Sequence, residues 1–255
     1  MVIQSVERAT AIMSLFTSSR STLGISEIAS ALNLNKATVW GLVTTLEKQR
    51  FLQQDPDTRK YRIGPKLLEL GIVYESSLEL NARAARRVRT LATRTRMDAR
   101  VGIWEEGAVL ITLLAMPRAA DTLSHQIGPR VPAHCSGVGK ALLAFLEPDE
   151  LEKYLRATPL DRHTRHTITS ADKLRKDLEQ IRERGYSISR EEMIPGLTAL
   201  GAPIFGKKQQ LEGAVGISGS DITERFTGWR LEKLADELLR TASLISQDMG
   251  YHGPY

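Results

Sequence analysis

The sequence predicts an α+β protein in which an N-terminal winged helix-turn-helix is joined by a linker helix to an α/β domain with a mostly antiparallel sheet. Three observations predict this class. Helix-spaced apolar residues precede two short strand patterns, a long arginine-rich helical stretch follows, and strands then alternate with helices. The expected domains span residues 1–65, 66–97 and 98–255.

The first domain is predicted to contain three helices and a hairpin. Apolar residues at helical spacing predict a helix over residues 4–18, and "SEIASAL" predicts a second helix with Ser26 as its N-cap. Asn33 provides a turn residue that tolerates a left-handed backbone, and Asn35 caps a third helix. "FLQQ" and "KYRIG" predict strands joined by the turn "DPDTR". Together these elements form the pattern of a winged helix-turn-helix.

The third helix, "NKATVWGLVTTLEKQ", is predicted to have one packing face and one exposed face. Val39, Leu42, Val43 and Leu46 form an apolar stripe at helical spacing. Residues near the start of such a helix contact base edges in the major groove, and basic residues of the wing contact phosphates. The predicted DNA-binding residues are Ser26, Asn35, Lys36, Ala37, Thr38, Trp40, Gly41, Thr44, Arg59, Lys60 and Arg62.

Trp40 leaves two interpretations open. Either its indole contacts a thymine methyl group or the sugar backbone, with Gly41 allowing close approach, or it packs against the wing. Gly41 costs about 1 kcal/mol of helix propensity relative to alanine, so its presence favours a surface that something approaches closely.

Positive charge is concentrated in the first part of the chain. The net charge is +5 overall, but it is +7 over residues 1–97 and −2 over residues 98–255. Such asymmetry favours a basic module for a polyanion attached to a neutral module with another task. The alternative is a mildly basic solvated surface.

Composition excludes several other classes of protein. Hydrophobic residues make up 42% of the chain and charged residues 25%, which is typical of a folded soluble protein. No apolar run is long enough to predict a membrane span, and the first residues do not resemble a secretion signal. Cys135 is the single cysteine, which excludes an intramolecular disulfide. A cytoplasmic location is therefore expected, with association with the nucleoid while the protein is bound to DNA.

The second domain is predicted to be built from hairpins and amphipathic helices. Residues 98–115 predict a hairpin that turns at residues 105–107, and a second hairpin is expected around "GKKQQ". Helices are predicted for "SGVGKALLAFL", "DELEKYLRA" and "SADKLRKDLEQIRERG", and for residues 227–249. Residues 66–97 predict one long helix or two consecutive helices, beginning at Pro65, as a connector and dimer surface.

Several motifs suggest catalysis or cofactor binding, but each has a simpler interpretation. "SGVGKA" lacks the glycine spacing and the hydroxyl residue of a phosphate-binding loop, although the start of its helix can bind an anion. His134 and Cys135 are sequence neighbours, which does not make them a nucleophile–base pair. His163 and His166 lie in a polar loop, where a metal role has only weak support. We therefore predict no catalytic residue, no metal and no cofactor.

The residues quoted above resemble the IclR family of bacterial transcription regulators over nearly the whole chain. "QSVERATAIMSLF" and the segment from "SEIASAL" to "GPKLLELG" carry the resemblance in the first half. "VPAHCSGVGKALLAFL", "REEMIPGLTALGAPI" and "GAVGISGS" carry it in the second half. The resemblance implies a DNA-binding domain, a linker and an effector-binding domain, assembled as a dimer or a dimer of dimers. The family usually has arginine near Gly41 and often histidine at Trp40, so operator preference does not transfer.

The resemblance also implies an effector cavity between the sheet and the helix that starts near Ser136. Family members that bind small polar acids carry Asp near Ser189, Cys near Ala199 and Ser near Gly216, and this chain is smaller or less polar at all three. We therefore expect a larger, partly apolar effector, such as an aromatic acid, with Arg100 or His134 near its carboxylate. The predicted effector-binding residues are Trp104, Met116, His134, Cys135, Ser136, Gly137, Ser189, Glu191, Ala199, Gly216 and Ser218.

The predicted function is a ligand-responsive DNA-binding regulator of catabolic genes, acting as repressor or activator. Its expected partners are a double-stranded DNA operator, a small-molecule effector and further copies of the same chain. Three alternatives remain: an enzyme with an appended DNA-binding domain, a constitutive DNA-binding protein with a ligand-insensitive second domain, and a protein-interaction module. A turnover assay tests for the enzyme, and a metabolite screen for ligand-dependent DNA affinity tests for the constitutive DNA-binding protein. Binding that does not depend on DNA sequence and salt would indicate the protein-interaction module.

Overall fold

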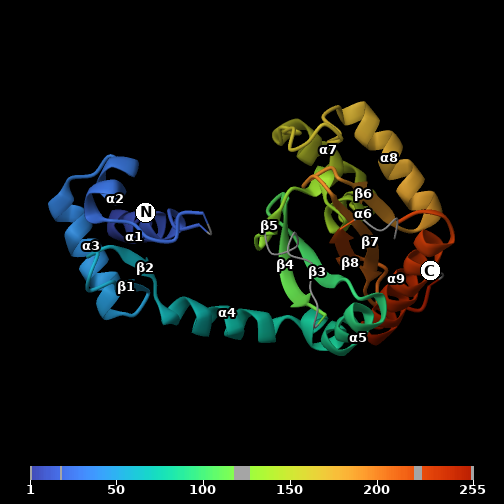
Figure 1. The fold of residues 1–255 in the computed structure, drawn as a ribbon, viewed down its shortest axis with the longest axis horizontal. Helices are drawn as coiled ribbons and strands as arrows, with labels where there is room; N and C mark the ends of the chain where they lie inside the picture. The colour runs from blue at the N-terminus through green and yellow to red at the C-terminus, as the bar shows by residue number, and fades with distance from the viewer. Residues whose placement is uncertain (1, 18, 118–126, 221–225, 254–255) are drawn as a thin grey trace. The chain divides into compact units, whose positions relative to one another are not determined.

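The computed structural model describes residues 2–17, 19–117, 127–220 and 226–253 (Figure 1). The chain divides into two compact units, residues 1–77 and residues 78–255. Among the described residues, no helix combines the length and the apolar character that crossing a membrane requires.

The first unit has four helices and a two-stranded sheet, and its first three helices and the sheet are those predicted for the winged helix-turn-helix. Its elements are α1 (Gln4–Ser14), α2 (Ile25–Ala31), α3 (Lys36–Lys48), β1 (Leu52–Gln54), β2 (Tyr61–Ile63) and α4 (Pro65–Ser77). β1 and β2 pair antiparallel, so the predicted hairpin is confirmed. The helix predicted to reach residue 18 ends at Ser14.

The start of α2 differs from the prediction. Ser26 lies inside the helix and is not its N-cap, because the helix begins at Ile25 and Gly24 is the capping residue. The backbone amide of Gly24 donates to Oε2 of Glu27 at 2.7 Å, and this bond fixes the start of the helix. The cap of α3 was predicted correctly, since Oδ1 of Asn35 accepts from the amide of Thr38 at 2.7 Å. Asn33 has a positive φ of 51°, as its turn position requires.

Residues 66–97 form two helices, and the two helices belong to different units. α4 begins at Pro65, as predicted, and α5 (Glu79–Thr95) follows a break at Leu78. α5 buries one face in the second unit. The domain boundaries expected at residues 65 and 97 stay predictions. The boundary between the two compact units falls between residues 77 and 78, inside the predicted linker.

The second unit contains an antiparallel sheet of six strands in the order β5-β4-β3-β8-β7-β6. Its strands are β3 (Asp98–Glu105), β4 (Ala108–Ala115), β5 (Arg130–Val131), β6 (Ser187–Arg190), β7 (Leu197–Phe205) and β8 (Leu211–Ser220). The turn between β3 and β4 has positive φ at Glu106 and Gly107, where the sequence predicted it. The short strand β5 was not predicted, because two residues carry no periodicity.

Helices cover both faces of this sheet (Figure 1). They are α5, α6 (Gly137–Phe145), α7 (Pro148–Ala157), α8 (Ala171–Arg184) and α9 (Gly228–Asp248). α5 and α9 pack on one face, where Val215 and Ile217 of β8 belong to their core. Ala214 belongs to the core of α6 and α8, because alternate residues of a strand face opposite sides. A 3₁₀ turn, η2 (Ala133–Cys135), leads into α6 and was not predicted.

The close approach of α6 to η2 gives the first testable prediction. A Cβ at Gly139 would lie 2.4 Å from Cα of Ala133, whereas a Cβ at Gly71 of α4 would meet nothing within 4 Å. We expect Gly139→Ala to lower the free energy of unfolding by about 1–3 kcal/mol through overpacking. We expect Gly71→Ala to raise it by up to about 1 kcal/mol. Urea unfolding followed by circular dichroism measures both changes, and equal effects of the two variants would contradict the prediction.

Candidate functional site

The helix-turn-helix of the first unit fixes α3 by packing and by its cap. Val39, Val43 and Leu46 are buried in the core of this unit together with residues of α1 and α2. The bond from Thr38 to Asn35 closes the first turn of the helix. The opposite face of α3 is therefore held in place while its side chains remain free of the core.

That outer face is exposed, as a DNA-binding surface requires. Lys36, Ala37, Trp40 and Gly41 are exposed, and the indole of Trp40 keeps 59% of its surface accessible. A Cβ at Gly41 would meet no atom within 4 Å, so packing inside the chain does not require glycine there. The exposure of Trp40 favours contact with an outside partner over packing against the wing.

The wing turn carries the basic residues that the sequence singled out. Oδ1 of Asp55 accepts from the amide of Thr58 at 2.8 Å, which closes the turn before Arg59, a residue with a φ of 57°. Lys60 pairs with Glu27 of α2 at 3.2 Å, and the amide of Gly24 together with Lys60 lowers the pKa of that carboxyl group. Arg59 and Arg62 are exposed, so they are better placed for phosphate than Lys60.

The second unit contains a cavity between the sheet and the start of α6. The volume of this cavity is about 40 Å³. Seven of the residues predicted to bind effector line this cavity: Cys135, Ser136, Gly137, Ser189, Ala199, Gly216 and Ser218. The structure thus brings together residues from η2, α6, β6, β7 and β8, and their role in binding stays a prediction.

The cavity is apolar except for one charged group and a few hydroxyl groups. Arg100 of β3 lies in its wall, donates from Nη1 to Oγ of Ser218 at 2.6 Å and pairs with Asp98 at 3.3 Å. Burial lowers the pKa of Arg100, while Asp98 opposes that shift. Oγ of Ser189 donates to the carbonyl oxygen of Cys135 at 2.6 Å. A ligand in this cavity would therefore meet an apolar wall and one guanidinium.

Four residues predicted to bind effector lie outside the cavity wall. Nε1 of Trp104 donates to Glu150 at 3.1 Å, and its ring packs edge-on against Tyr154. Met116 is 50% exposed, since it follows the last residue of β4. His134 lies one residue before Cys135 in η2, and its ring nitrogen Nε2 lies 3.0 Å from the carbonyl oxygen of Asp161.

Glu191 is the fourth residue outside the wall. It follows β6 with a φ of 52°, and its Oε2 accepts from the amide of Gly196 at 2.8 Å. Its neighbour Glu192 is buried and ion-paired with Lys140 at 2.7 Å. Both carboxylates therefore have structural contacts, and neither lines the cavity.

The lysine of "SGVGKA" has a structural role. Lys140 is 1% exposed, and its ammonium pairs with Asp177 of α8 at 2.7 Å as well as with Glu192. Burial raises the pKa of Glu192, and Lys140 opposes that shift. Ser136 caps the helix, because its Oγ accepts from the amide of Gly139 at 3.2 Å. The ammonium of Lys140 is therefore engaged by two carboxylates and does not line the cavity.

The thiol of Cys135 is not poised for nucleophilic chemistry. Burial raises its pKa to about 12, so the thiol is protonated near neutral pH. Burial also lowers the pKa of His134, because it disfavours the charged imidazolium.

The remaining wall residues were missed in the sequence. They are Ile111, Ile127, Val131, Val138, Met193, Leu197, Leu200 and Ile217. Most are apolar residues that a core would also contain, so residue type gives no signal. Alternation along β7 could have placed Leu197 on the same face as Ala199, but it places Leu200 and Ile217 on the opposite face. Ile127 and Met193 lie in irregular segments without periodicity.

Comparison with known proteins decides the family. The family model described as "Bacterial transcriptional regulator IclR C-terminal" matches residues 72–247, and the "IclR helix-turn-helix domain" matches residues 5–56. The HTH-type transcriptional regulator BhcR of Paracoccus denitrificans is 34% identical over 97% of this chain and 88% of its own length. The chain belongs to the IclR family of bacterial transcriptional regulators.

Two further proteins are similar over nearly their whole length. The glycerol operon regulatory protein of Streptomyces coelicolor is 34% identical over 97% of both chains. The crystal structure of an IclR homolog from Microbacterium hydrocarbonoxydans, complexed with 4-hydroxybenzoate, has a TM-score of 0.82. It is 22% identical over 96% of this chain and 98% of that chain, which shows the shared fold.

Membership in the IclR family defines the function at the level of class. The protein is a ligand-responsive, DNA-binding transcription regulator and not an enzyme. The predicted fold class is also confirmed: a winged helix-turn-helix unit and an effector-binding unit with an antiparallel sheet.

The exposed indole of Trp40 gives a prediction about DNA binding. We expect Trp40→Ala to weaken operator affinity about tenfold, on the scale of one lost base contact. The free energy of unfolding should change by less than about 0.5 kcal/mol, because the side chain is mostly exposed. Fluorescence anisotropy with labelled operator DNA measures the affinity. Trp229→Ala, at another exposed tryptophan, is the matched control. Unchanged affinity with a lower melting temperature would favour packing against the wing.

The buried ion-pair network gives a prediction about stability. Lys140→Met leaves Asp177 and Glu192 without their shared cation, so we expect a loss of about 3–5 kcal/mol in the free energy of unfolding. The control is Lys173→Met, at an exposed lysine of α8. Urea titration of both variants measures the difference. A loss in Lys140→Met no larger than that in the control would contradict a structural role for the lysine.

Proposed function

We propose that this IclR-family regulator binds a two-part operator as a homodimer or a dimer of dimers, and that a small organic acid with an apolar, aromatic body controls it. The observation that carries the effector class is the cavity wall, in which Arg100 is the one charged residue among the lining residues described. The proposal places the protein in the cytoplasm, where operator and metabolite are both accessible.

The DNA-binding part of the proposal rests on α3 and the wing. Lys36, Trp40 and Gly41 lie on the exposed face of a helix that packing holds in place. Arg59 and Arg62 supply charge for phosphates on the flank of that helix. A dimer would present two such helices to half-sites of a palindromic or repeated operator.

Dimerisation is supported by α4. All of its residues are described, and none of them is buried. Leu68, Ile72, Val73 and Tyr74 are exposed large apolar residues on this one helix. Such a patch is unusual on a monomeric surface and fits a partner with the same apolar face, such as α4 of a second copy.

The effector class follows from the chemistry of the cavity. Apolar side chains such as Ile111, Val131 and Met193 form most of its wall, while Arg100 is paired with Asp98 inside it. An aromatic acid would place its ring on the apolar wall and its carboxylate near the guanidinium or the start of α6. The Microbacterium homolog complexed with 4-hydroxybenzoate supports the view that this fold can hold a ligand of that kind.

The size of the cavity adds a condition to the proposal. A cavity of about 40 Å³ holds a few water molecules, and an aromatic ring needs more space. Effector binding must therefore widen the cavity. Met193, in the irregular segment between β6 and β7, is a flexible side chain at the wall that can move. Binding then shifts the protein between two arrangements by its difference in affinity for them.

An acid screen by thermal shift tests the effector class. We expect aromatic acids to raise the melting temperature and short aliphatic acids to leave it unchanged. Ala199→Leu fills the cavity and should abolish the aromatic shift, whereas Ala157→Leu, at an exposed residue that ends α7, should retain it. Stabilisation by the short acids alone would overturn the proposed class. Operator binding that ignores every stabilising acid would favour a constitutive DNA-binding protein.

A further inference from the structure

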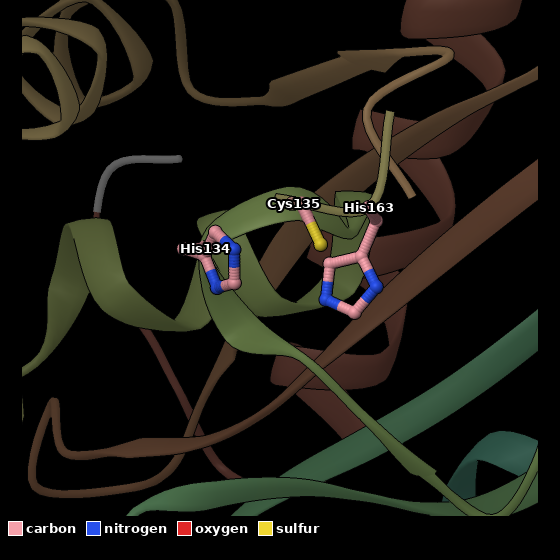
Figure 2. Close-up of side chains that lie close together, drawn as sticks. All are labelled: His134, Cys135 and His163. Carbon is pink, nitrogen blue, oxygen red and sulfur yellow. The ribbon is translucent and has the colours of Figure 1, made fainter. Parts of the chain in front are cut away.

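His134, Cys135 and His163 lie together beside the cavity, although their sequence positions gave no reason to group all three. His134 and Cys135 belong to η2, and His163 comes from the loop between α7 and α8. One ring nitrogen of each histidine and Sγ of Cys135 all lie within 4.8 Å of one another. Figure 2 shows the sulfur between the two imidazole rings. The fold thus collects one sulfur and two nitrogen donors at one point.

A second observation concerns the ring of His134. This side chain is 2% exposed, and its Nε2 lies 3.0 Å from the carbonyl oxygen of Asp161. A carbonyl oxygen only accepts, so Nε2 carries the proton and Nδ1 presents a lone pair. Among the residues that the structure describes, no group hydrogen-bonds to Nδ1. A buried acceptor without a partner is costly, and this one is a ring nitrogen of a residue of the donor cluster.

The arrangement matches the way in which proteins prepare a histidine for a metal. A ligating imidazole usually donates its second ring N–H to a carbonyl or a carboxylate, which fixes the tautomer and orients the ring. Asp161 supplies that carbonyl to His134.

We propose that His134, Cys135 and His163 bind a divalent transition-metal ion of the zinc class. Thiolate and imidazole donors suit Zn²⁺ and its neighbours and are poor ligands for Mg²⁺ or Ca²⁺. Binding transfers the thiol proton of Cys135 to solvent and forms a metal–sulfur bond, while both imidazoles bind in their neutral form. With three protein ligands, the fourth tetrahedral position is left for water or another small ligand.

The site closes by a movement of His163. Metal–nitrogen and metal–sulfur bonds of about 2.0–2.3 Å place tetrahedral donors about 3.3–3.6 Å apart, which is closer than the 4.8 Å limit of the cluster. His134 and Cys135 are buried in η2 and are held there, whereas His163 is exposed in its loop. The exposed side chain of His163 is therefore the ligand that moves most easily to complete the set.

Cobalt titration of the full-length, metal-free protein tests the proposal. We expect one equivalent of Co²⁺ per chain to produce a near-ultraviolet thiolate-to-cobalt charge-transfer band, and Zn²⁺ to displace it. Cys135→Ser should lose this band. His163→Ala should weaken binding by at least about tenfold, because it removes one of three ligands. Its matched control is His166→Ala, at an exposed histidine of the same loop that lies outside the cluster.

The outcomes separate a built site from adventitious binding. Loss of affinity in His163→Ala with wild-type affinity in His166→Ala would support the three-residue site. Absence of the charge-transfer band in the wild-type protein would overturn it, and so would equal weakening by the two histidine variants. Far-ultraviolet circular dichroism of each variant verifies that the fold is retained. The readout involves neither operator nor effector, so it is independent of the proposed function.

Discussion

The effector-binding unit depends on the direct contact of the α6 backbone with β7. A Cβ at Gly201 would lie 2.3 Å from the carbonyl oxygen of Gly137, and a Cβ at Gly137 would lie 2.9 Å from the carbonyl carbon of Leu200. Glycine on both sides is what lets helix and strand meet at this distance. Oγ of Ser187 donates to the same Gly137 carbonyl at 2.5 Å. The start of α6 is thereby fixed over the sheet, and the cavity lies where it begins.

The same close packing explains why a lysine is buried in this helix. Lys140 lies one turn after the N-cap, in a helix covered by the sheet and by α8, so its ammonium cannot reach water. Two carboxylates from different elements neutralise it, Asp177 from α8 and Glu192 from the segment after β6. That segment also places Met193 at the cavity wall. A single ion-pair network therefore holds the helix, its outer neighbour and part of the cavity wall in register.

The sequence predicted the elements whose signals are local. The cap at Asn35, the turn at Asn33 and the hairpin turn after Glu105 each follow from the conformational preference of one or two residues. The cap at Ser26 was predicted wrongly because Gly24 takes that role with the help of Glu27, and neither residue is decisive by itself.

The predicted effector-binding residues differ in where the structure places them. The resemblance selected six residues that line the cavity, whereas Trp104, expected as an apolar wall, lies outside it. Its indole instead meets α7, and periodicity cannot reveal the partner of a strand residue across a domain.

The helix α4 combines two requirements. An isolated helix of 13 residues is only marginally stable in water, so α4 needs something to pack against. Leu68, Ile72 and Val73 are exposed, so the described residues of the chain do not cover them. The same helix is the stretch of chain that leads from the first unit to the start of the second. Because the surface that needs a partner lies on the covalent connection between the units, whatever covers α4 also constrains how the DNA-binding unit is attached. The proposed surface for a second copy of the chain and the connection between the two units therefore lie on the same helix.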